Sequence, residues 1–139
     1  MKQTQLVVNA VVIYNDKILL TKRNEDKEDS KFHNLWQLPG GGLEFGETPE
    51  QTLHREMKEE CGIDVKITSL FPKIYTEQRN YWQGVFIIYI CEMIDVSQKI
   101  IINDEATEYG WFNNIEIAKL ELMPMLENAL SEIASYLKS

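Results

Sequence analysis

The sequence predicts an α+β fold, a three-layer α/β/α sandwich in which a mixed central β-sheet lies between helices. Three observations lead to this prediction. Apolar runs with the length and composition of β-strands recur along the chain, and two stretches show helical periodicity. The elements also follow the order strands, helix, strands, helix. With 139 residues, the chain is expected to form one domain, residues 1–139.

The predicted strands are rich in Val, Ile and aromatic residues. Residues 6–14 are almost continuously apolar, which indicates a central strand buried on both faces. A turn at residues 15–17 leads into a second strand, residues 17–22, and the two form a hairpin. The charged residues 24–31 then form a surface loop. Further strands are predicted at residues 35–39, 65–71, 74–76, 85–93 and 109–112, with a polar turn at residues 77–80.

Two helices are predicted. Thr48 is a suitable N-cap, Pro49 suits the first helical position, and Gln51 completes a capping box with Thr48. Gly62 is a natural stop, so this helix covers residues 49–61. The second helix covers residues 124–137, where apolar side chains recur at helical spacing and are expected to pack on the core.

The first helix carries acidic side chains that crowd on one side. At about 100° per residue, Glu56, Glu59 and Glu60 form one patch beside the apolar stripe, although like charges at this spacing repel. Glu60 lies nearest the stripe, so without a cation its pKa should be raised by burial. A bound divalent cation would turn the patch into a ligand set, and Mg²⁺ prefers such oxygen ligands. The glycine run at residues 40–42 predicts a sharp turn or a close approach of the backbone to a metal or phosphate.

Composition narrows the class of protein. The formal charge of −8 argues against nucleic-acid or membrane binding by bulk attraction. Cys61 and Cys91 are isolated, which favours a reduced, cytoplasmic location. No stretch has the pattern of a secretory signal or the length of a membrane span. A homodimer is the commonest oligomeric state and is the prior expectation here.

The segment GGLEFGETPEQTLHREMKEECGI, residues 41–63, resembles the Nudix box, G-x5-E-x7-R-E-U-x-E-E-x-G-U, in which U is a bulky aliphatic residue. Every specified position matches. Outside the box, WQLPGG before it and EATEYGWF late in the chain also resemble this family, most closely its MutT-like members. The resemblance implies the Nudix fold and a hydrolase that uses Mg²⁺ or Mn²⁺ to cleave a nucleoside diphosphate linked to another moiety.

The resemblance also implies roles for residues of the box. Glu56, Glu59 and Glu60 would ligate metal, with the Gly41 backbone carbonyl as a further ligand. Two other residues, Glu47 and Arg55, would pair and brace the loop against the helix. An arginine can hold a carboxylate through two hydrogen bonds, which agrees with this pairing.

Family members often use one more acidic residue outside the box, as a ligand or a general base. The candidates here are Glu105 and Glu108, and we favour Glu105, which lies six residues before Trp111.

The substrate is less clearly indicated. Trp36, Tyr81 and Trp82 are candidates for a base-binding pocket, which requires aromatic or apolar walls. A small-molecule nucleotide is expected, and a nucleoside triphosphate cleaved to monophosphate and pyrophosphate is the first choice. An ADP-sugar, a dinucleoside polyphosphate or a capped RNA remain alternatives. A Nudix-like binding module without turnover is the competing class.

Overall fold

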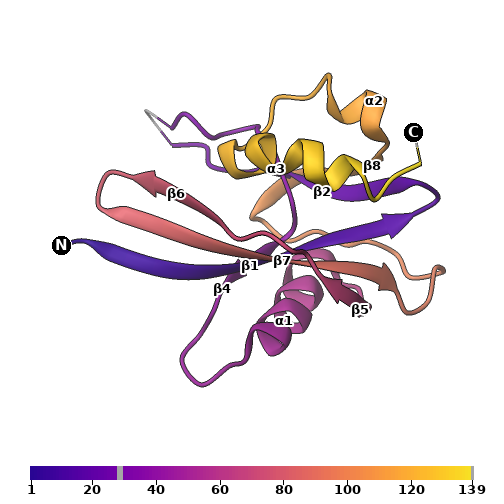
Figure 1. Cartoon of the computed structure of the whole chain (residues 1–139), viewed down its shortest axis with the longest axis horizontal. Helices are drawn as coiled ribbons and strands as arrows, with labels where there is room; N and C mark the ends of the chain where they lie inside the picture. The colour runs from indigo at the N-terminus through magenta and orange to yellow at the C-terminus, as the bar shows by residue number, and fades with distance from the viewer. Residues whose placement is uncertain (28–29, 139) are drawn as a thin grey trace.

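The computed structural model describes residues 1–27 and 30–138. Its described residues form an eight-stranded mixed sheet with helices on both faces (Figure 1). The strands are β1 (Gln3–Tyr14), β2 (Lys17–Arg23), β3 (Trp36–Gln37), β4 (Gly40–Gly42), β5 (Val65–Leu70), β6 (Tyr75–Arg79), β7 (Trp82–Met93) and β8 (Ala106–Phe112). The helices are α1 (Pro49–Cys61), α2 (Asn114–Ile117) and α3 (Pro124–Ala134).

Strand β1 organises the sheet. It pairs in parallel with β7 over most of its length, and β5 and β6 pair antiparallel with β7. The predicted hairpin between β1 and β2 is present, but the two strands pair only at Ile13↔Ile18 and Tyr14↔Lys17. Beyond these pairs, β1 continues to β4 while β2 turns to β3 and β8. The two strands therefore diverge, and the sheet opens between them.

The side chains of β1 point alternately to the two faces of the sheet, and each face packs into its own apolar layer. Val8, Ala10 and Val12 are fully buried against α1, which contributes Leu53 and Met57 to the same cluster. Residues of the other phase, with Val11 fully buried among them, face α3. Figure 1 shows α1 and α3 on opposite sides of the sheet, so the predicted three-layer sandwich is confirmed.

Helix α1 has the predicted bounds and caps. Thr48 and Gln51 form the capping box, and Gly62 ends the helix in the left-handed conformation at φ 69°. These features depend on neighbouring residues in the sequence, which explains why they could be predicted from it.

Other elements differ from the prediction. The glycine run is strand β4 rather than a turn, because its backbone pairs with β1. Residues 77–79 continue β6, and the turn comes later, at Asn80, which has φ 53°. Helix α2 was not predicted, and α3 ends at Ala134. Glu28 and Asp29 of the predicted charged loop lie outside the described residues.

Among residues 1–27 and 30–138, no helix combines the length and the apolar character that crossing a membrane would require.

Candidate active site

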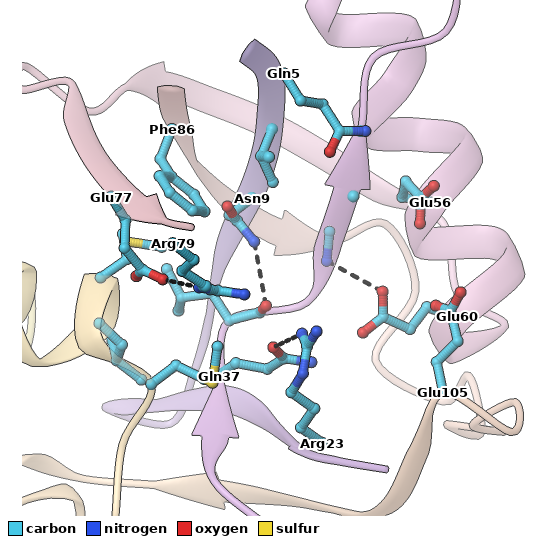
Figure 2. A pocket seen from close by; sticks show the side chains of 18 of the residues that line it. Gln5, Asn9, Arg23, Gln37, Glu56, Glu60, Glu77, Arg79, Phe86 and Glu105 are labelled. Carbon is cyan, nitrogen blue, oxygen red and sulfur yellow. Dashed lines mark hydrogen bonds and ion pairs between the residues drawn. The ribbon is translucent and has the colours of Figure 1, made fainter. Parts of the chain in front are cut away.

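A cavity of about 440 Å³ lies where β1 and β2 diverge. Its walls come from segments far apart in the sequence, including β1, β4, α1, β6 and the residue before β8. Figure 2 shows Glu56, Glu60 and Glu105 on one side of this cavity and Arg79 and Phe86 on the other. The cavity therefore has an acidic wall and an opposite wall of mixed chemistry.

The acidic wall brings three carboxylates together. One carboxylate oxygen from each of Glu56, Glu60 and Glu105 lies within 4.8 Å of the others. The loop that carries Glu105 is tied to α1, since the Asn103 backbone N–H donates to the Glu60 carbonyl at 3.2 Å. The Asn103 side chain then accepts from the Glu105 backbone N–H at 3.0 Å. Hard oxygen ligands at this spacing fit a divalent cation such as Mg²⁺.

Electrostatics support a cation at this cluster. Glu60 is only 2% exposed, and desolvation raises the pKa of its carboxyl from 4.5 to about 8. Hydrogen bonds from the Gly40 backbone N–H, at 3.2 Å, and the Thr21 hydroxyl, at 3.4 Å, offset only part of this. Burial also raises the pKa of Glu56, although the nearby Arg55 opposes it. A cation would hold both carboxyls in the ionised form.

Arg55 connects the helix, the loop before it and the cluster. Its Nε and Nη2 donate to the two carboxylate oxygens of Glu47 at 2.6 and 3.0 Å, which is the predicted bidentate pair. Nη2 also donates to the Gly42 carbonyl at 3.1 Å, and Nη1 donates to Glu56 at 2.8 Å. The guanidinium lowers the pKa of Glu47 to about 2. Arg55 thus holds β4 and Glu56 in fixed positions relative to α1.

Gly41 lies against the cluster. A Cβ at this position would lie 2.5 Å from the carboxylate carbon of Glu56, closer than side chains approach one another. The close approach expected of the glycine run is therefore an approach to the carboxylate that would hold a metal. Any side chain here would displace Glu56.

Two acidic candidates lie away from the cluster. The side chain of Glu59 is 58% exposed and accepts from Arg55 Nη1 at 3.3 Å. The predicted patch thus divides, and Glu105 stands with Glu56 and Glu60 where Glu59 was expected. Glu108 pairs with Lys22 at 3.6 Å and is not part of the three-carboxylate cluster.

Of the three aromatic residues predicted to form a base-binding pocket, only one lines the cavity. Trp36 is 7% exposed and packs edge to face on Phe112 in the core, with ring centroids 4.9 Å apart. Tyr81 is 64% exposed and lies in the turn between β6 and β7. Neither contributes to the wall of the cavity. Trp82 does, and its indole N–H donates to the Gln5 side chain at 3.1 Å.

Other wall residues were not predicted. Among them are Asn9, Arg23, Gln37, Arg79 and Phe86. A signal existed for Asn9, because a polar residue interrupts the apolar run of β1 and shares a face with Gln5. Its side chain donates to the carbonyls of residues 38 and 39 at 3.2 and 3.4 Å. Arg23 donates to Gln37 at 3.2 Å across β2 and β3, a contact that only the strand pairing creates.

Comparisons with known proteins agree with this geometry. The family model described as NUDIX domain matches residues 3–133. The nucleoside triphosphatase NudI of Escherichia coli is 30% identical over 127 residues, covering 85% of this chain and 89% of that protein. NudI of Salmonella paratyphi B is 31% identical over 126 residues. The crystal structure of a MutT Nudix hydrolase from Burkholderia pseudomallei superposes with a TM-score of 0.80 at 25% identity, covering 94% of this chain and 98% of that one.

Proposed function

This chain belongs to the Nudix family and is a pyrophosphohydrolase, and from that premise we propose that it hydrolyses nucleoside triphosphates to monophosphate and pyrophosphate. The observation that carries the proposal is the cluster of three carboxylates, with Glu60 buried at its base, facing one end of a nucleotide-sized cavity. A cavity of about 440 Å³ lies within the range of small-molecule sites. The relatives named as nucleoside triphosphatases support this choice of substrate.

Glu56, Glu60 and Glu105 would hold Mg²⁺ or Mn²⁺, with the Gly41 carbonyl and Glu59 as further ligands. The cation would supply charge neutralisation and polarisation of the phosphoryl group. It would also offset the repulsion between a polyphosphate and a chain with a formal charge of −8.

The chain's own residues position the reactants. Arg55 keeps Glu56 oriented through their hydrogen bond at 2.8 Å, and Glu47 keeps Arg55 in place through two more. Glu105 is the exposed member of the cluster, so it is the carboxylate best placed to take the proton of the attacking water. The water oxygen then bonds to a phosphorus of the anhydride that joins the α- and β-phosphates. The P–O bond of that anhydride breaks, and monophosphate and pyrophosphate separate.

Related substrates share the same chemistry at the acidic wall. An ADP-sugar, a dinucleoside polyphosphate or a capped RNA would also place a diphosphate there. They differ in what lies beyond the diphosphate, so product analysis separates them.

The decisive experiment incubates the protein with a nucleotide panel and Mg²⁺ or Mn²⁺, and measures phosphate and pyrophosphate separately. Pyrophosphate release from triphosphates, lost in EDTA and in the Glu56→Gln, Glu60→Gln double variant, is the expected result. Glu108→Gln is the matched control and should retain activity. Hydrolysis that survives EDTA would refute the metal site, and orthophosphate as the first product would refute the proposed cleavage.

A further inference from the structure

Arg79 lies on the wall of the cavity opposite the carboxylate cluster (Figure 2). Its Nε donates to the Glu77 carboxylate, two residues earlier on the same face of β6. Its guanidinium carbon lies 4.4 Å from the ring centroid of Phe32 and 4.8 Å from that of Trp82. One ion pair and two aromatic contacts thus hold this guanidinium in place.

Within the described part of the chain, the Nη groups of Arg79 are free to bind a ligand. Among the described residues, the hydrogen bonds of Arg79 come from Nε alone. Figure 2 shows the guanidinium projecting into the cavity below Asn9. An arginine offers only donors, so its partner in the cavity must be an acceptor.

The position favours a base over a phosphate as that partner. Glu77 already neutralises the charge of Arg79, which weakens its attraction for a phosphate. The phosphates would lie at the acidic wall with the cation, on the other side of the cavity. Besides Glu77, this wall carries the apolar and aromatic side chains of Trp82, Phe86 and Met125, which a stacked base requires.

We propose that Arg79 determines base specificity by donating a hydrogen bond to a carbonyl oxygen of the nucleobase. Guanine, cytosine, uracil and thymine each carry such an oxygen, and adenine carries none. At C6, where guanine and hypoxanthine carry the oxygen, adenine presents an amino group, whose donors oppose those of Arg79 at that position. The inference rests on the proposed nucleotide substrate, and it predicts selection against adenine nucleotides.

The test compares inosine and adenosine triphosphates, which differ in having a carbonyl or an amino group at C6. Wild-type kcat/KM should favour ITP over ATP by about ten- to a hundredfold, the range for a hydrogen bond to a charged donor. Arg79→Met keeps an unbranched apolar side chain beside the rings and should remove the preference by lowering ITP turnover, with ATP unchanged. Arg79→Lys, which keeps a donor, should restore part of the preference. Lys66→Met, an exposed change on β5, is the control.

Equal losses for ITP and ATP in Arg79→Met would show a phosphate or structural role and overturn the inference. Hydrolysis of both nucleotides at equal rates by the wild type would overturn it while the proposed function stands. Equilibrium affinities for IMP and AMP provide a readout that needs no turnover. If no nucleotide is hydrolysed, the proposed function fails, and equal affinities for IMP and AMP would still overturn the role of Arg79.

Discussion

Replacing Glu60 by Gln is expected to stabilise the metal-free protein, and to do so more strongly as the pH rises. Glu60 is 2% exposed and has no arginine or lysine partner among the described residues. An ionised carboxylate there is therefore costly. Glutamine has nearly the shape of the protonated carboxyl and can still accept from the Gly40 backbone N–H.

The magnitude follows from the pKa of Glu60, which is about 8 in the folded protein against an ordinary value of 4.5. The folded state keeps this proton over a pH range in which the unfolded chain has lost it. The ionisation of Glu60 therefore costs no unfolding free energy below a pH of about 4.5. Above that pH the unfolding free energy falls, until the pH passes about 8. At about 1.4 kcal/mol per pKa unit, the loss is at most about 5 kcal/mol. About 3 kcal/mol of it falls between pH values of about 5.5 and about 8.5.

Urea denaturation in EDTA at these two pH values, for the wild type and Glu60→Gln, measures the effect. The gain in unfolding free energy of the variant should be larger at the higher pH. Glu108→Gln, which alters an exposed carboxylate, is the control and should show no such increase. A difference that is independent of pH, or a less stable variant at the higher pH, would refute the reasoning.

Added Mg²⁺ gives the complementary result. A ligand that binds only the folded state at one hundred times its dissociation constant stabilises by about 2.7 kcal/mol. Wild-type protein should gain stability with Mg²⁺, and more at the higher pH, where ionising the ligand costs less. Glu60→Gln should gain much less.

Three further predictions concern the same site. Glu105→Gln should lower kcat by about a hundredfold or more while changing the unfolding free energy by less than about 1 kcal/mol, and Glu108→Gln should change neither; an unchanged rate would remove Glu105 from the mechanism. Gly41→Ala should displace Glu56, whose carboxylate carbon lies 2.5 Å from the added Cβ position. This displacement should reduce kcat by about tenfold or more. A crystal structure of the variant with Glu56 unmoved would contradict this. Arg55→Lys should lower the unfolding free energy by about 1–2 kcal/mol, because lysine cannot form the bidentate pair, and thermal denaturation that matches wild type would count against it.

Much of the acidic wall could be predicted because its determinants are local. Helical spacing placed Glu60 beside the apolar face, and the box placed Glu47 eight residues before Arg55. The burial of Glu60 and the bidentate pair in the structure confirm both expectations. Helical geometry did not separate Glu59 from its neighbours, because that depends on which side of the helix the Glu105 loop covers.

The sequence by itself indicated helix α1 and its caps, a close approach of the backbone in the glycine run, the family, and the burial of Glu60. Each depends on residues within a few turns of one another, where backbone geometry is regular. The tertiary structure alone decided which distant residues complete the site. Glu105 reaches Glu60 across 45 positions of sequence, and Arg79 faces the same cavity from another strand. Strand register and the divergence of β1 from β2 bring these distant residues together, and long-range pairing leaves no local pattern in the chain.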